Sequence, residues 1–192
     1  MKVREGWVAW HDEENDIVFA MLFTVEEDAV YPHGGHNFEI WTSGEGTVNT
    51  GNQERKHEYN PETANMELEV LGPVTRLSPG ESAFMDVTWG VCNASGVKRV
   101  TPIGVIVEDF KFDKNKVVTA KFCVFNGGTL EEFFTDKDGN KKGRTMVGDV
   151  SPLSEVRFER KPIIPIDAVT LRYQIRGYDN NIAGVLCELE IK

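Results

Sequence analysis

Residues 100–125 read VTPIGVIVEDFKFDKNKVVTAKFCVF and contain the clearest structural pattern in the chain. Apolar side chains alternate with polar ones through Val105, Val107 and Phe110, as expected of a strand with one buried face. The polar tetrapeptide 113–116 separates this run from a second apolar run, and such tetrapeptides commonly join antiparallel strands. We therefore predict a β-hairpin.

Short runs of β-branched and aromatic residues, separated by Gly, Pro, Asn and Asp, recur along the whole chain and favour strands. The expected strands are Gly6–His11, Ile17–Val25, Asn37–Thr42, Asn65–Leu71, Ser82–Val91, Val100–Phe112, Val117–Phe125, Glu155–Phe158, Ala168–Arg176 and Gly184–Ile191. Only Thr129–Thr135 and Ser151–Val156 could form a short helix. The prediction is an all-β protein with β-sandwich architecture.

Acidic side chains are concentrated in the first half of the chain. Residues 1–96 contain 5 basic and 17 acidic side chains, whereas residues 97–192 contain 16 and 14. The change falls in a polar stretch with Gly and Pro near Ser95, which suits a linker. We predict an acidic β-sandwich domain over 1–95. A second β-sandwich region, immunoglobulin-like or carbohydrate-module-like, is predicted over 96–192.

The formal net charge of -10 opposes binding to a nucleic-acid backbone. No segment approaches the roughly 20 consecutive apolar residues of a membrane helix, and the N-terminus lacks the apolar core of a signal peptide. We therefore expect a soluble protein with neither nucleic acid nor membrane as a partner. Its compartment is open, because a secreted protein whose leader has been removed fits equally well.

The chain has three cysteines, Cys92, Cys123 and Cys187. Their odd number and long spacings predict neither a disulfide framework nor a paired zinc knuckle. We expect them to be buried, reduced thiols.

The most unusual local sequence is YPHGGHN, residues 31–37, in which His33 and His36 flank two glycines. Glycine lets the backbone approach a ligand closely. The stretch leads into a strand on which Glu39 and Trp41 share one face. We predict that His33, His36 and Trp41 bind substrate on a concave surface, because an indole face beside hydrogen-bonding groups suits a sugar ring. The alternative is a glycine turn with solvated histidines and a core tryptophan.

Neutral imidazole also ligates transition metals, and His33, His36 and Glu39 are spaced three residues apart. The stretch contains no HExxH helix and no cysteine. A metal site is therefore the less favoured interpretation, and no metal ion is predicted.

Glu67 and Glu69 alternate with apolar residues in the segment 65–71, so both carboxylates should project from one face of a strand. Two carboxylates at this spacing repel each other, and one with a raised pKa would suit general acid or base catalysis. A solvent-facing strand in an acidic domain is the alternative.

Two features of the second half have plain structural explanations. Residues 135–141, TDKDGNK, alternate oxygen-bearing side chains as a calcium loop does, but they lack the closing acid, so an Asp-Gly hairpin turn is expected. A second ligand face could comprise Phe158, Arg172, Tyr173 and Tyr178, although strands use such residues for packing.

Four stretches read NFEIWTSG (37–44), NMELEVLGP (65–73), LSPGES (77–82) and VTW (87–89). Together they resemble the final strands of the galactose-mutarotase-like (aldose epimerase-like) β-supersandwich. In that family a strand of Gln or Glu, aliphatic, aromatic and Thr precedes a strand that carries a glutamate. A turn of Leu, any residue, Pro, Gly and Glu then leads into the last long strand. The resemblance covers about residues 31–91.

The resemblance implies that Glu67, or Glu69 one alternation later, corresponds to the general base of the aldose epimerases. The family's catalytic histidines come from strands upstream of the matching part, so the resemblance assigns no catalytic role to His33 or His36. The same fold occurs in domains of glycoside hydrolases and polysaccharide lyases, which implies a carbohydrate ligand. It also implies a supersandwich fragment, either truncated or completed by a second copy in a homodimer.

No phosphate-binding loop, nucleophile elbow, flavin fingerprint or CxxC motif occurs, so no cofactor is predicted. The leading hypothesis is a carbohydrate-binding protein that recognises a saccharide or polysaccharide beside Trp41, His36 and Glu67. The first alternative is a glycoside hydrolase in which Glu67 acts as acid or base, with Glu39 or Glu69 as its partner. The second is a non-catalytic assembly module that binds another protein through an exposed strand edge, for which the strand Val100–Phe112 is the candidate.

Overall fold

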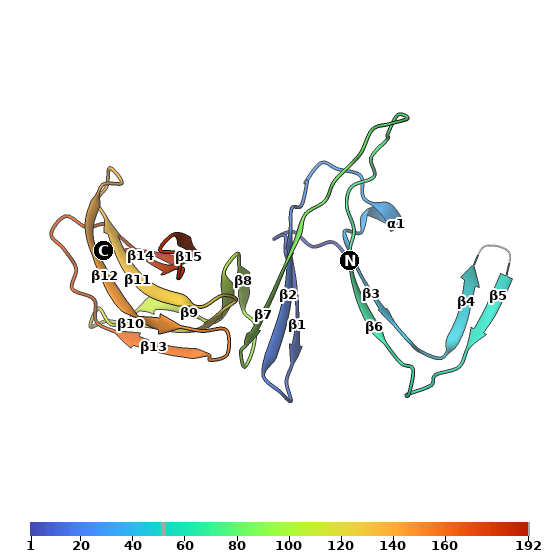
Figure 1. Cartoon of the computed structure of the whole chain (residues 1–192), viewed down its shortest axis with the longest axis horizontal. Coiled ribbons are helices and arrows are strands. Elements are labelled where there is room, and N and C mark those ends of the chain that lie inside the picture. Colours follow the sequence, from blue (N-terminus) through green and yellow to red (C-terminus); the bar gives the residue numbers. More distant parts are fainter. Residues whose placement is uncertain (51–52, 192) are drawn as a thin grey trace. The chain divides into compact units, whose positions relative to one another are not determined.

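The computed structural model describes residues 1–50 and 53–191, except for the side chains of residues 48–50, 53, 55 and 57. This part of the chain is all-β, with antiparallel sheets, none of them closed, and one short helix (Figure 1). The elements are β1 (Trp7–Asp12), β2 (Ile17–Phe23), α1 (Pro32–Gly35), β3 (Phe38–Thr42), β4 (Gly46–Thr50), β5 (Gln53–His57), β6 (Met66–Val70), β7 (Val87–Asn93), β8 (Arg99–Thr101), β9 (Gly104–Phe112), β10 (Val118–Val124), β11 (Gly128–Thr135), β12 (Lys141–Val150), β13 (Val156–Arg160), β14 (Thr170–Arg176) and β15 (Ile182–Glu190). None of the described residues belongs to a helix long and apolar enough to span a membrane.

Contacts divide the chain into two compact units that interleave in sequence. The first unit comprises Met1–Gly6 and Phe23–Val87, and the second comprises Trp7–Leu22 and Thr88–Lys192. The units therefore differ from a single cut at Ser95, whose N–H and Oγ both donate to Glu155 within the second unit. The predicted division into domains 1–95 and 96–192 stays a prediction.

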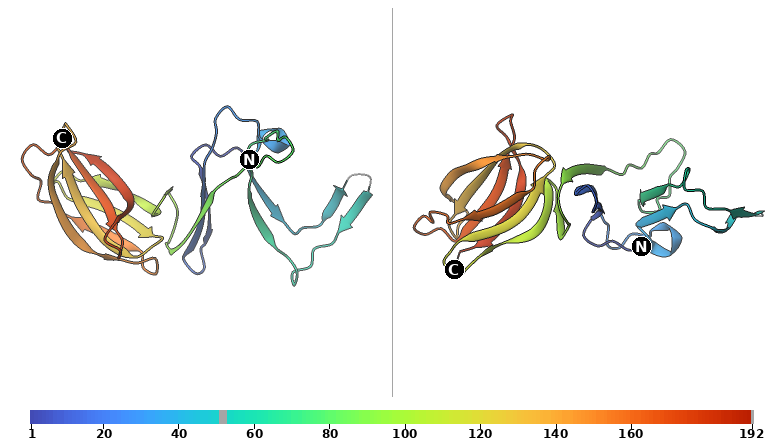
Figure 2. Two further views of the ribbon diagram at one scale, coloured as in Figure 1. Left: turned by 45° about the horizontal axis from the view of Figure 1, so that its top comes forward. Right: turned by 90° about the horizontal axis from the view of Figure 1, so that it is seen from below.

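Most of the apolar core lies in the second unit, between two four-stranded sheets with the orders β13-β10-β9-β8 and β12-β11-β14-β15 (Figure 2). An aromatic cluster joins them: the ring of Phe110 in β9 stacks on Tyr173 in β14 at 5.1 Å between centroids, and Phe158 in β13 meets Tyr173 edge-on at 5.0 Å. Alternation along each strand directs these side chains inward. Because Phe158 and Tyr173 are buried, the second ligand face considered from the sequence is wrong.

A smaller apolar cluster belongs to the same unit and contains Val18, Cys92, Ala94, Val105 and Cys123. It involves the three-stranded sheet β1-β2-β7 together with β9 and β10. All three cysteines are free thiols; Cys92 and Cys123 are buried, as expected, whereas Cys187 is only half-buried.

The hairpin predicted around residues 113–116 is confirmed, since β9 and β10 pair antiparallel across it. The Asp-Gly turn at 135–141 is also a hairpin, in which Asp136 accepts hydrogen bonds from the Asp138 and Asn140 N–H groups. The predicted long strand Val100–Phe112 is instead two strands, β8 and β9.

Both helix candidates are wrong. Thr129–Thr135 lies in β11, where it pairs with β12 on one side and β14 on the other. Its Phe133 and Phe134 fit a pleated, half-buried surface better than a helix. Residues 151–156 form a turn closed by the Ser151–Ser154 bridge and lead into β13.

The first unit contains two separate hairpin-like pairs, β3–β6 and β4–β5. Among its described residues only Asn37 and Phe38 are buried, so this unit has little apolar core of its own. The predicted strand Ser82–Val91 begins only at Val87, as β7. β4, β5 and β12 were not predicted, because their polar residues give no clear apolar alternation.

Candidate functional site

The Gly-Gly loop folds as a single helical turn, α1, closed by the His36 N–H donating to the Pro32 carbonyl at 2.9 Å. Gly34 and Gly35 have φ angles of +80° and +93°, in the left-handed region that glycine adopts most readily, and His33 also has a positive φ of +50°. The turn raises His33 above the start of β3 and leaves its imidazole 63% exposed.

β3 is anchored at its start by the N-terminal segment. The Asn37 side chain accepts from the Val3 N–H at 2.7 Å and donates to the Val3 carbonyl at 2.8 Å. The Met1 nitrogen donates to the Phe38 carbonyl, also at 2.7 Å. These contacts bury Asn37 and Phe38 and fix the strand on which the next residues project.

Pairing with β6 places four of the predicted site residues on one face of a two-stranded sheet. Glu39 lies directly opposite Glu69, and Trp41 directly opposite Glu67. Since residues two apart on a strand share a face, this face carries three carboxylates and one indole. Glu67 and Glu69 were predicted to share a face, and they do.

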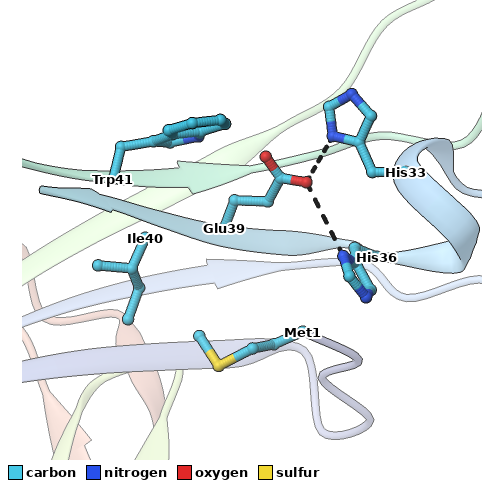
Figure 3. A pocket seen from close by; sticks show the side chains of 6 residues that line it. All are labelled: Met1, His33, His36, Glu39, Ile40 and Trp41. Carbon is cyan, nitrogen blue, oxygen red and sulfur yellow. Dashed lines mark hydrogen bonds and ion pairs between the residues drawn. The ribbon is translucent and has the colours of Figure 1, made fainter. Parts of the chain in front are cut away.

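A pocket of about 640 Å³ lies around β3 and is lined by Met1, His33, His36, Glu39, Ile40 and Trp41. Figure 3 shows the Glu39 carboxylate between the Trp41 indole and the His33 ring, with Ile40 and Met1 on the other side of the strand. β3 pairs only with β6 among the described strands, and Met1 covers the start of its other edge, so residues from both faces of β3 line the pocket. Glu67 and Glu69 extend the acidic face beyond this pocket.

Glu39 is the centre of the polar contacts. His33 Nδ1 donates to Glu39 Oε1 at 2.5 Å, and His36 Nδ1 lies 3.9 Å from the same oxygen. The hydrogen bond from His33 holds the pKa of the Glu39 carboxyl below its ordinary value; desolvation opposes the shift, and the Trp41 indole and the His36 charge add to it. Glu39 is therefore an ionised acceptor, suited to hold a hydroxyl or amine.

Trp41 is 53% exposed, so the alternative of a core tryptophan is wrong. An indole kept out of the core offers one flat apolar face to a ligand. The other exposed tryptophans, Trp10 and Trp89, belong to the second unit, where Trp89 contacts Phe19 edge-on at 5.8 Å.

Glu67 is exposed and accepts a hydrogen bond from Asn65 Nδ2 at 2.9 Å. Asn65 is in turn held by Ser43 Oγ, which accepts from the Asn65 N–H at 3.0 Å. The Glu67 carboxylate thus has a fixed partner at the open end of the face, away from the imidazoles.

No group of three His, Cys, Asp or Glu side chains among the described residues is arranged to hold a metal ion. In the pocket, the Nδ1 atom of His33 is hydrogen-bonded to Glu39 and is therefore not available to a metal ion.

Comparisons with protein-family models, with curated proteins and with solved structures find no match.

Met1 and Ile40 were not predicted as site residues. Met1 reaches the pocket through backbone pairing across 37 residues, for which a single sequence contains no signal. Ile40 was expected on the face of β3 opposite Glu39 and Trp41, which is correct. It still lines the pocket, because the pocket is open to both faces of the strand.

Proposed function

We propose that the pocket around Trp41 binds a saccharide. The observation that carries the proposal is the half-exposed Trp41 indole next to the ionised Glu39 carboxylate, in one pocket with two imidazoles. Ligand sites combine apolar surface with a few fixed polar groups, and a sugar ring presents both an apolar face and a rim of hydroxyls. The bound ring stacks on Trp41, and its hydroxyls donate to Glu39.

Glu67 and Glu69 support binding of more than one sugar unit. They continue the same face of the sheet beyond the pocket, opposite Trp41 and Glu39. Carboxylates accept hydrogen bonds from hydroxyls, so a polysaccharide running along the face would find an acceptor at each step. Binding of longer oligosaccharides is therefore tighter than binding of monosaccharides.

The test is calorimetric titration of the full chain with a panel of soluble oligosaccharides from plant, algal and microbial glycans. We expect Trp41→Ala to weaken the affinity at least about tenfold, since it removes the stacking surface. Trp10→Ala is the matched control, because it removes a 41% exposed tryptophan from the second unit. If Trp41→Ala binds as tightly as the parent, or if the parent binds no glycan, the proposal fails.

The finer architecture is part of the proposal. The shared core between the two four-stranded sheets supports an immunoglobulin-like or carbohydrate-module-like β-sandwich in the second unit. The segments that resemble the mutarotase-like supersandwich coincide with β3 and β6 of the first unit and with β7, which belongs to the second unit after Val87; this supports an ancestral fragment of that fold. A solved complex or a detectable relative would test both assignments.

A glycoside hydrolase is the second candidate, favoured by the juxtaposition of Glu39 and Glu69 on adjacent strands. Two neighbouring carboxyl groups are the minimum for acid and nucleophile or base. The lowered pKa of Glu39 suits a nucleophile or base and not the acid, so Glu67 or Glu69 would have to donate the proton. Chromatography of soluble products from polysaccharides tests this: products should vanish in Glu67→Gln or in Glu69→Gln, whichever residue is the acid, and persist in the Glu62→Gln control; products that persist in both would exclude this role.

The third candidate is an assembly role. It is favoured by the open edges of the β3–β6 sheet and by the face of that sheet opposite Glu39 and Trp41. Ile40 is 48% and Met66 46% exposed there. We propose that a second copy completes this sheet in a homodimer, as unpaired strand edges commonly do. Sedimentation over a range of concentrations tests it: Ile40→Lys should abolish any dimer, and a parent that is monomeric throughout excludes the role.

A further inference from the structure

Two strands of the second unit bring a pair of thiols together in the smaller apolar cluster. Cys92 in β7 and Cys123 in β10 are 1% and 0% exposed, and both pack with Val18, Ala94 and Val105. The two thiols lie near enough for each to shift the pKa of the other. Two strands of different sheets thus contribute one thiol each to the same small buried cluster.

The turn at residues 151–154 fixes this arrangement. The Pro152 carbonyl accepts the Asn93 N–H at 2.8 Å, and the same oxygen lies 3.5 Å from Cys123 Sγ. The Pro152 carbonyl thus contacts both the Cys123 thiol and Asn93, the residue after Cys92. The carbonyls of Ser151 and Ser154 lie 3.6 and 3.5 Å from the same sulfur, which leaves its side chain little freedom.

We propose that Cys92 and Cys123 are a modification site, at which an oxidant of the disulfide class converts the two thiols into a disulfide bond between β7 and β10. β7 is the strand by which the chain re-enters the second unit at Thr88. The bond closes a loop from Cys92 to Cys123 and holds this strand to the main sheets. The third cysteine, Cys187, takes no part, because it packs in the larger core.

The two thiols have different reactivity. The interaction between the two thiols raises the pKa of Cys92 and lowers that of Cys123, so Cys123 gives up its proton first. The Cys123 thiolate attacks one sulfur of oxidised glutathione, and a glutathione thiolate leaves. Cys92 then loses its proton and attacks the Cys123 sulfur, which expels the second glutathione. Two cysteines are oxidised, and one glutathione disulfide is reduced to two thiols.

Because both sulfurs are buried, the oxidant reaches them only when the structure opens locally. The turn above Cys123 is the place for this, since it is short, is closed by the Ser154 N–H to Ser151 carbonyl bond at 3.3 Å, and exposes 79% of Leu153. Oxidation should therefore be slow in buffer and faster in a low concentration of urea.

The experiment treats the full chain with oxidised glutathione, then unfolds it in an alkylating reagent and counts the modified cysteines by mass spectrometry. We expect one alkylated cysteine, Cys187, where the untreated chain has three. Peptide mapping should find Cys92 joined to Cys123. The midpoint of thermal unfolding should rise by about 5 °C, because the cross-link restricts the unfolded chain.

Cys187→Ser is the matched control and should form the same bridge, whereas Cys92→Ala should show no glutathione-dependent rise of the midpoint. Alanine is small and apolar, so the cluster should still pack. Three alkylated cysteines after complete treatment, a bridge that includes Cys187, or a bridge that lowers the unfolding midpoint would each overturn the proposal.

Discussion

Glu39 lies between an imidazole and an indole, and this position decides its charge. His33 donates to it at 2.5 Å, and Glu69 lies directly across on β6. The pKa of Glu39 is below its ordinary value of 4.5, so the hydrogen bond from His33 outweighs the desolvation.

The stability of the folded protein should decrease at acidic pH because of Glu39. Because the folded state lowers the pKa of Glu39, the contribution of the His33–Glu39 pair to stability is present above pH 4.5 and is lost as the pH falls through the lowered value. Titration of the Glu39 carboxyl by NMR should show a higher pKa in His33→Ala. His36→Ala, which removes a group 3.9 Å away, should shift it less. Equal values in the parent and His33→Ala would refute this account.

Glu132 is a buried carboxylate in the main core, and its Oε1 accepts from Tyr173 OH at 3.1 Å and from Arg160 Nε at 2.7 Å. Tyr173→Phe removes one of these donors and should lower the free energy of unfolding by about 1.5–2 kcal/mol. Tyr178→Phe is the control, since Tyr178 is 81% exposed, and should leave it unchanged. Urea titration measures both; a Tyr173→Phe protein as stable as the parent would contradict the argument.

At the level of strands, the alternation of residue types predicted the faces of β3 and β6 correctly. Glu39 and Trp41 share one face, and so do Glu67 and Glu69. The sequence could not predict that the two faces coincide, because pairing across the segment between Thr42 and Met66 depends on contacts that periodicity does not report. The acidic and aromatic residues of the site were thus found separately, and the structure brings them together.

Strand β11 illustrates where local patterns fail. Its two adjacent glutamates, Glu131 and Glu132, read as exposed positions, yet both are 0% exposed. Arg176 pairs with Glu131 at 2.5 Å and Arg160 with Glu132, so the ion pairs that permit burial come from β14 and β13. Partners this distant in sequence override local propensity, so the stretch forms a strand and not the short helix that its sequence allows.

The paired strands β9 and β10 approach each other closely enough at Gly104 to exclude a side chain. A Cβ added at Gly104 would lie 2.2 Å from the Cys123 carbonyl oxygen, so Gly104→Ala must displace backbone. We expect it to lower the free energy of unfolding by at least about 2 kcal/mol. Gly148→Ala in β12 meets nothing within 4 Å and should be nearly neutral. Chemical denaturation of the two variants checks this, and equal stabilities would contradict the close approach.

Across the chain, burial is uneven. Both apolar clusters lie in the second unit, whereas the described residues of the first unit bury only Asn37 and Phe38. We predict that amide hydrogens of β10, β11 and β14 exchange slowly and those of β3 and β6 much faster, since local opening costs least where few apolar contacts are lost. Hydrogen-exchange mass spectrometry measures this. If β3 and β6 exchange as slowly as β10, β11 and β14, and this protection is lost when the protein is diluted, a second copy of the chain covers the first unit instead.

The central claim is that a saccharide binds against Trp41, and one spectrum tests it most directly. The chain has four tryptophans, and each indole N–H gives its own NMR signal, with that of Trp41 assigned by its loss in Trp41→Ala. Titration with a binding glycan should shift the Trp41 signal and leave those of Trp10 and Trp89 in place. A glycan that binds without moving the Trp41 signal, or a panel in which no glycan moves it, would contradict the account.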